Sequence, residues 1–209
     1  MPLPLTIYLA SGNANKVGEI MRAAALFGAP VTFEGASALG GMPEIAETGS
    51  TLVENAKLKA HALRKQSGGN AWICADDTGL FVEVLDGEPG VHTARYAGAD
   101  GNAEKNVAKL LEAMKGYPPR MRKAEFRCCL VLIDPEGNES VFEGIFKGRI
   151  AKETNGAGGF GYDPVFIPEG YNATVAELDD DTKNRISHRA RAVRAMLESL
   201  LKNAVTIAY

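Results

Sequence analysis

Two adjacent carboxylates, Asp76 and Asp77, directly follow the apolar run 71–75, which reads as a buried strand. Ionised carboxylates side by side repel each other, and they gain stability when a divalent cation or a cationic ligand lies near them. Glu44 and Glu47 precede the next expected helix and could supply a further oxygen ligand. The pattern therefore indicates either a cation site or a simple polar turn after a strand.

The segment Asn155–Phe166, N-G-A-G-G-F-G-Y-D-P-V-F, is unusually rich in glycine. Gly156 to Gly161 formally spell G-x-G-x-x-G, but no helix is expected to follow, as a dinucleotide loop requires. The Lys-Ser/Thr pair of a Walker loop is also missing. Phe160 and Tyr162 alternate with the glycines, so backbone approach plus an aromatic platform favours a flat heterocycle over a flexible hairpin end.

Basic residues accompany both features. Lys59 stands four residues after Asn55, on one face of an expected helix that Ser50 or Thr51 could cap. In the segment 183–189, Ser187 could cap the last helix and leave its free N–H groups near an anion. These lysines and arginines are candidate phosphate contacts, and the alternative is a solvated basic surface.

Composition limits the function classes. The net charge of −3 does not favour nonspecific binding to nucleic acid or to an anionic membrane. No apolar run approaches the roughly 20 residues of a membrane span. The three cysteines lack metal-ligand spacing and are expected to be packing residues in a reducing cytoplasm.

The elements that must position these residues alternate between strand and helix. Strands are expected at 6–10 and 71–75, and helices at about 17–25, 51–66 and 102–114. Segments 124–133 and 139–150 flank a strong hairpin turn at 134–138, and the chain closes with a helix whose apolar stripe is Ile186, Ala190, Val193, Leu197 and Leu200. The sequence therefore predicts an α/β fold with a mixed central sheet flanked by helices.

Seven segments together resemble the inosine triphosphate pyrophosphatase family, the HAM1-like hydrolases of non-standard purine nucleotides. The resemblance runs nearly end to end, in the family's order. Its segments are Ser11–Lys16 with Glu19, Glu47–Gly49 with Glu54–Ala56 and Lys59, Ala75–Leu80, Pro89–Val91 with Ala94–Gly98, Gly158–Pro164, Ala176–Leu178, and Lys183–Asn184 with Ile186–Arg189.

This resemblance implies a single domain over 1–209, built as two lobes with a deep nucleotide cleft between them. It implies a cytoplasmic homodimer that uses Mg²⁺ to hydrolyse dITP, ITP and XTP to the monophosphate and pyrophosphate, which cleanses the nucleotide pool. Neither nucleic acid nor membrane is an implied partner.

Site roles carry over by position in the family's segments. Ser11, Gly12, Asn13, Ala14, Asn15 and Lys16 would hold the triphosphate, and Thr78, Lys59 and Lys183 would contact phosphate. Glu47 and Asp77 would bind the metal, with Asp77 also activating the water. The purine pocket would comprise Phe160, Gly161, Tyr162, Asp163, His188 and Arg189.

The chain departs from the family pattern at three places: Thr78 replaces Ser, His92-Thr93 replaces Tyr-Ser, and Ala190 replaces Gly. Two other classes remain open from the residues alone. A nucleotidyltransferase would share the glycines, lysines and acidic site but needs a second substrate. A nucleotide sensor would keep the pocket and could dispense with Asp77.

Overall fold

The computed structural model describes residues 5–99 and 101–206, and the chain divides into two compact units. Unit 1 comprises Met1–Asp77, Cys128–Gly144 and Ser187–Tyr209, and unit 2 comprises Thr78–Arg127 and Ile145–Ile186. Three long strands contribute residues to both units: β3 (Trp72–Val82), β5 (Lys123–Ile133) and β6 (Glu139–Ile150).

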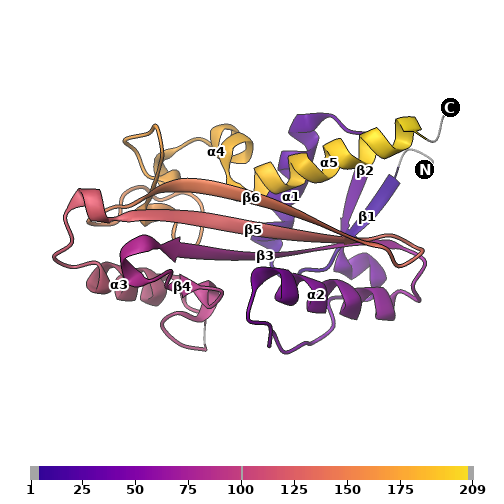
Figure 1. Cartoon of the computed structure of the whole chain (residues 1–209), viewed down its shortest axis with the longest axis horizontal. Coiled ribbons are helices and arrows are strands. Elements are labelled where there is room, and N and C mark those ends of the chain that lie inside the picture. Colours follow the sequence, from indigo (N-terminus) through magenta and orange to yellow (C-terminus); the bar gives the residue numbers. More distant parts are fainter. Residues whose placement is uncertain (1–4, 100, 207–209) are drawn as a thin grey trace. The chain divides into compact units, whose positions relative to one another are not determined.

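Within the part of the chain that the structure describes, the strands form one mixed seven-stranded sheet in the order β2-β1-β3-β5-β6-β7, with β4 paired to β3 (Figure 1). β1 (Leu5–Leu9) runs parallel to both β2 (Val31–Gly35) and β3, whereas β7 (Phe166–Pro168) is antiparallel to β6 and β4 (Pro89–Gly90) is antiparallel to β3. The predicted α/β class with a mixed sheet is confirmed. The deep cleft between lobes stays a prediction.

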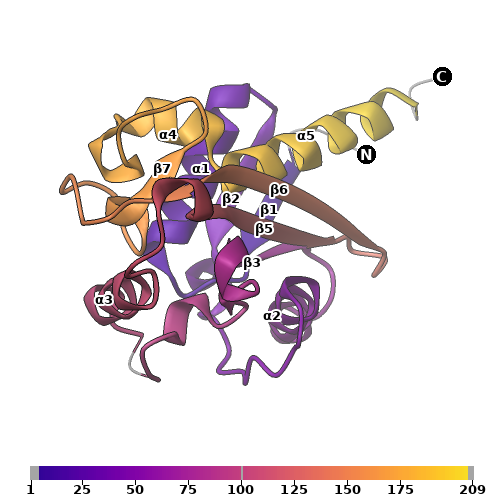
Figure 2. The same cartoon turned by 60° about the vertical axis from the view of Figure 1, so that its left-hand side comes forward.

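In unit 1, helices lie on both faces of the sheet. α1 (Ala14–Phe27) and α5 (His188–Thr206) pack with β1 and the even-numbered positions of β3 and β5, and α2 (Leu52–Gln66) lies on the opposite side (Figures 1 and 2). The hydrophobic core on the α1/α5 side includes Ile7, Leu130, Val193 and Met196. Both faces are therefore closed to water here, so charged groups inside unit 1 must find partners in the protein.

Helix ends in unit 1 follow the expected capping chemistry. Asn13 caps α1 by accepting from the N–H groups of Asn15 and Lys16, and Gly28 ends it with a φ of 62°. Thr51 caps α2 in a capping box with Glu54. The hydroxyl of Ser187 accepts from Ala190 N at 3.2 Å, which confirms its predicted cap on α5.

In unit 2, a second core packs α3 (Ala103–Ala113) and the segment around β7 against the sheet. Phe166 is fully buried there, with its ring centroid 4.8 Å from that of Phe126 and 5.3 Å from that of Phe146. The short helix α4 (Asp180–Ile186) ends this unit. Among the described residues, no helix has the length and apolarity needed to cross a membrane.

Two local expectations were wrong. The strand expected to stop at residue 75 continues to Val82, so Asp76 and Asp77 lie inside β3 and not in a turn. Ile186 belongs to α4 and packs with the unit 2 core. It is therefore not part of the apolar stripe of α5, whose buried residues are Ala190, Val193, Leu197 and Leu200. β2 and α4 were not anticipated.

Candidate functional site

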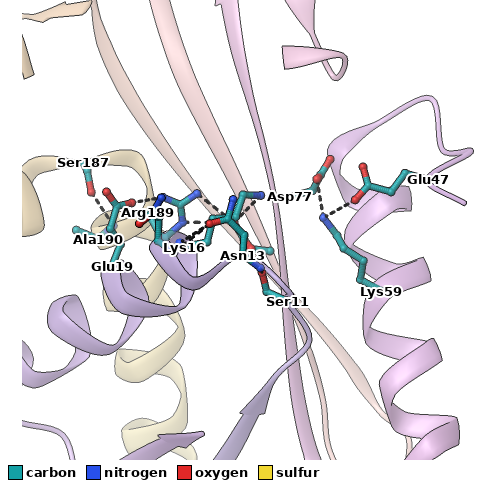
Figure 3. A network of polar contacts seen from close by, with 12 residues as sticks. Ser11, Asn13, Lys16, Glu19, Glu47, Lys59, Asp77, Ser187, Arg189 and Ala190 are labelled. Atoms are coloured by element: carbon teal, nitrogen blue, oxygen red, sulfur yellow. Dashed lines mark hydrogen bonds and ion pairs between the residues drawn. The ribbon is translucent and has the colours of Figure 1, made fainter. Parts of the chain in front are cut away.

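Asp77 meets a lysine and a second carboxylate on one face of β3. Lys59 Nζ lies 2.7 Å from Asp77 Oδ1 and 3.4 Å from Glu47 Oε1, so one ammonium bridges the two acids (Figure 3). The side chains of Lys59 and Asp77 are 9% and 8% exposed, whereas that of Glu47 is 35% exposed. This cluster of Glu47, Lys59 and Asp77, called the acidic cluster below, joins α2, the segment before it and β3.

Asp76 points to the other face of β3 and has its own cations. Lys16 Nζ lies 3.3 Å from Asp76 Oδ2, and Arg189 donates to the same oxygen from Nε at 3.3 Å and from Nη2 at 3.1 Å. Arg189 also binds Glu19 of α1 through Nη1 (Figure 3). Arg189 is 1% exposed, so a buried network of two acids and two cations ties α1 and α5 to β3.

Burial and charge set different pKa values for the two aspartates. Burial alone would raise the pKa of Asp76, but Lys16, Arg189 and Lys59 outweigh it and hold that pKa well below its usual range. For Asp77 burial dominates, and its pKa is raised although Lys59 opposes the shift. A carboxylate that is more basic than usual yet reachable is a better proton acceptor. Asp77 is therefore the better candidate for a general base.

The Ser11–Lys16 segment forms the start of α1. Asn13 is exposed, and its side-chain oxygen accepts hydrogen bonds from the backbone N–H groups of Asn15 and Lys16, at 3.0 and 3.3 Å. A helix N-terminus favours anions because its N–H groups and its dipole face the same way. Lys16 adds a positive charge at this end, since its side chain is 20% exposed while it binds Asp76.

The glycine loop of unit 2 is organised around Asp163. Its Oδ2 accepts from Phe160 N at 2.8 Å and from Lys183 Nζ at 2.5 Å. Gly159 has a φ of 74°, and a Cβ there would collide with the Asp163 carboxylate. Lys183 Nζ also lies 4.9 Å from the Phe160 ring centroid, and Tyr162 donates to Thr93 O at 2.9 Å. Gly159 thus lets the backbone close around the Asp163 carboxylate, which binds the backbone N–H of Phe160.

The structure brings the predicted site residues together in two groups, one in each unit. Unit 1 holds the acidic cluster, the start of α1, and the helix residues His188 and Arg189. Unit 2 holds Thr78 and the loop with Lys183, which lies beside Phe160. Union of the two groups into one site stays a prediction. Glu19 was absent from the predicted site, although its place three residues after Lys16 on α1 could have suggested it.

The acidic cluster suits a magnesium ion that is shared with substrate. Carboxylate oxygens are the protein ligands Mg²⁺ prefers, and it is usually held by one or two of them together with substrate phosphates. Lys59 already shows that a cation can bridge Glu47 and Asp77. Within the described ranges 5–99 and 101–206, no group of three His, Cys, Asp or Glu residues could form a cage on its own. The two carboxylates therefore fit the ion if phosphates complete its shell.

A cavity of about 750 Å³ in unit 2 is separate from all these residues. It is lined by Phe81, Arg127 and Lys147 among others, and by none of the predicted site residues. Arg127 is paired with Glu125 and stacks 4.5 Å above the Phe81 ring centroid. The cavity therefore does not bear on the nucleotide site.

Comparisons with known proteins agree with this fold. The model of the Ham1 family matches residues 7–199. A dITP/XTP pyrophosphatase of Porphyromonas gingivalis is 48% identical, covering 93% of this chain and 97% of that protein, and one of Opitutus terrae is 44% identical, covering 93% and 98%. A solved HAM1 protein from Coxiella burnetii superposes with a TM-score of 0.83 at 37% identity, covering 95% of this chain and 99% of that chain. The α/β chain with this mixed sheet belongs to the Ham1 family.

Proposed function

We propose that this protein is a Mg²⁺-dependent pyrophosphatase of non-standard purine nucleoside triphosphates. It hydrolyses dITP, ITP and XTP to the monophosphate and pyrophosphate. The observation that carries the proposal is the acidic cluster, in which the buried Asp77, whose pKa is raised, shares the Lys59 ammonium with Glu47. The relatives' names, dITP/XTP pyrophosphatase, support the same substrate class.

Attack of water at the α-phosphorus makes pyrophosphate the leaving group. Asp77 accepts a proton from the attacking water, and no covalent intermediate is needed. Bound Mg²⁺ supplies charge neutralisation on the phosphates and helps acidify the water. Lys59 and Lys16 offset the negative charge that develops on the leaving group, and the start of α1 presents the positive end of its helix dipole to the polyphosphate.

The base is bound by the glycine loop. Phe160 offers a ring for stacking, which every purine accepts equally. Its backbone is held by Asp163, which is in turn held by Lys183, so the ring is fixed before substrate arrives. Selectivity for a 6-keto purine is assigned to Arg189 and His188, with Gly161 and Tyr162 completing the pocket.

The protein works as a cytoplasmic homodimer in this proposal, without nucleic acid or membrane partners. Sedimentation equilibrium at micromolar concentration tests the dimer directly. A mass that stays at one chain's 22.2 kDa up to high concentration would refute this part of the proposal without affecting the chemistry.

One assay tests the activity. Purified protein is incubated with dITP and MgCl₂, and the products are separated by anion-exchange chromatography. Equal amounts of dIMP and pyrophosphate, formed without a second substrate and abolished by EDTA, are expected. Transfer of the nucleotide to an acceptor would indicate a nucleotidyltransferase, and tight binding without turnover would indicate a sensor.

A further inference from the structure

A buried asparagine one helical turn before Lys59 holds the segment that carries Glu47. Asn55 is fully buried in α2, and its side-chain Oδ1 accepts a hydrogen bond from Gly49 N at 2.8 Å. Its own N–H donates to Thr51 O at 3.1 Å, so its backbone belongs to the first turn of the helix. The amide thereby ties the start of a rigid helix to the chain just before it.

Gly49 is fitted closely to this contact. A Cβ on Gly49 would lie 2.7 Å from Asn55 Oδ1 and 2.9 Å from Asn55 N, distances that real Cβ atoms do not reach. Any larger residue would push the segment away from α2. Glycine is required here for close approach and not for a left-handed conformation.

Glu47 lies two residues before Gly49, within about 8 Å along the backbone. Its side chain is 35% exposed, in contrast to the 8% of Asp77. Asp77 is fixed by its place inside β3, whereas Glu47 lies in a segment without regular structure. Fixing the backbone at Gly49 therefore restricts where the Glu47 carboxylate can go.

The same helix makes both contacts. Asn55 holds Gly49, and Lys59, four residues later on the same face, holds the Glu47 carboxylate. The other side-chain atom of Asn55, Nδ2, is buried and has no hydrogen-bond partner among the described residues. Packing alone would be better served by an apolar side chain, because a buried unpaired amide is costly.

We propose that Asn55 is a positioning residue, which sets the Glu47 carboxylate for a divalent cation by holding the backbone of Gly49. The inference rests on the proposed Mg²⁺ role of Glu47 and Asp77. Residues that orient metal ligands in this indirect way typically change metal affinity about 10- to 100-fold when they are lost.

The test compares Asn55→Ala with wild type by titrating MgCl₂ in two ways. One readout is the Mg²⁺ midpoint of dITP hydrolysis, and the other is calorimetric Mg²⁺ binding with the α,β-methylene analogue of dITP, which cannot be cleaved. Asn55→Ala should raise the Mg²⁺ midpoint of hydrolysis and the calorimetric dissociation constant for Mg²⁺ by about 10-fold or more. The maximal rate at saturating Mg²⁺ should fall much less, since Asp77 is untouched.

Asn106→Ala is the matched control. Asn106 is also buried, near the start of α3, and its Oδ1 accepts from Ala97 N at 2.7 Å, the same helix-to-loop contact. It lies in unit 2, outside the acidic cluster. Its loss should lower the melting temperature as Asn55→Ala does, but leave the Mg²⁺ midpoint unchanged.

Two more variants keep the proposal open to refutation if Asn55→Ala folds poorly. Asn55→Asp retains an acceptor for Gly49 N and should recover most of the Mg²⁺ affinity. Gly49→Ala should raise the Mg²⁺ midpoint while Asn55 is intact, and hydrogen exchange at the residue 49 amide should accelerate. Unchanged Mg²⁺ midpoints in Asn55→Ala and Gly49→Ala, or an Asn55→Asp protein as impaired as Asn55→Ala, would overturn the proposal. Wild-type protein that neither binds Mg²⁺ nor hydrolyses dITP would instead refute the proposed function.

Discussion

Asp76 and Asp77 are neighbours in the sequence but bind different cations on opposite faces of β3. Asp76 accepts from Arg189 and pairs with Lys16, whereas Asp77 pairs with Lys59 at 2.7 Å. Adjacent side chains in a strand point to opposite faces, so the strand geometry separates two charges that would otherwise repel. Asp76 is thereby built into the network between α1, α5 and β3, whereas Asp77 lies in the acidic cluster and is the proposed general base.

Asp77→Asn should abolish most activity while the fold stays intact. The amide keeps the size of the side chain but cannot accept the proton of the attacking water or bind a cation as strongly. The turnover of dITP should fall by at least about 100-fold, as is typical for a lost acid–base group. Circular dichroism and steady-state kinetics check the two halves of this expectation. Near-normal turnover in a well-folded variant would contradict the role of Asp77.

Asp76→Asn should instead destabilise the protein, which makes it the natural partner experiment. The neutral amide leaves Arg189 and Lys16 buried or half-buried without their shared carboxylate. Removing one partner of a buried ion pair costs about 3–5 kcal/mol of unfolding free energy. Urea unfolding at pH 7 measures this loss. A variant as stable as wild type would show that the network contributes little.

The same contribution should depend on pH in the acid range. The pKa of Asp76 is lowered by its cations from an ordinary 3.8, so the folded protein favours the ionised form. The stabilisation is therefore present above about pH 4 and is lost as the pH falls through the lower folded-state pKa. The gap in unfolding free energy between wild type and Asp76→Asn should be constant from pH 7 to 5 and shrink below pH 4. A gap that widens on acidification would contradict the lowered pKa.

Sequence reasoning recovered the features that depend on local chemistry. The caps at Thr51 and Ser187 rest on short-range hydrogen bonds, which residue type reveals. The extent of β3 was missed because aspartates are depleted in strands, and only distant partners make them tolerable there. One of those partners, Arg189, lies 113 residues from Asp76 in the chain, and no local pattern joins the two.

Ala190 shows how a departure from the family pattern is accommodated. It is fully buried in the core between α1, α5 and the sheet, where its methyl group fills space. Its N–H donates to Ser187, so the added Cβ does not disturb the cap. Residue 190 lies inside α5, where the backbone accepts alanine as readily as glycine.

Lys59→Met and Lys183→Met should affect triphosphates more than monophosphates. Methionine keeps much of the stem but removes the charge that pairs with phosphate. Calorimetry with the α,β-methylene analogue of dITP and with dIMP gives the comparison. Lys183 also lies against Phe160 and Asp163, so its loss should weaken dIMP binding more than the loss of Lys59 does. Equal losses for both ligands in both variants would exclude a phosphate role.

Base selectivity is the most demanding prediction, because Arg189 also has a structural role in ion pairs inside the protein. Its guanidinium binds Asp76 and Glu19, and the residue is 1% exposed. Burial alone would lower the pKa of Arg189, but the charges of Asp76 and Glu19 outweigh burial and raise that pKa. Arginine offers five donors and no acceptor, so a 6-amino group facing it would leave both partners unpaired. Such a mismatch costs about 1–3 kcal/mol, on the order of 10- to 100-fold in rate.

Arg189→Lys separates the two roles of this residue. Lysine keeps one positive charge for the buried acids but loses the fork of donors. The free energy of unfolding should therefore fall, though less than in Arg189→Ala, where Glu19 and Asp76 both lose the guanidinium and Asp76 keeps Lys16. If Arg189 also reads the 6-oxygen, kcat/KM for dITP should fall more than that for ATP, and their ratio should shrink about 10-fold. A ratio that stays constant while both rates fall would make Arg189 a structural partner of Asp76 and place the reading of the base on another residue.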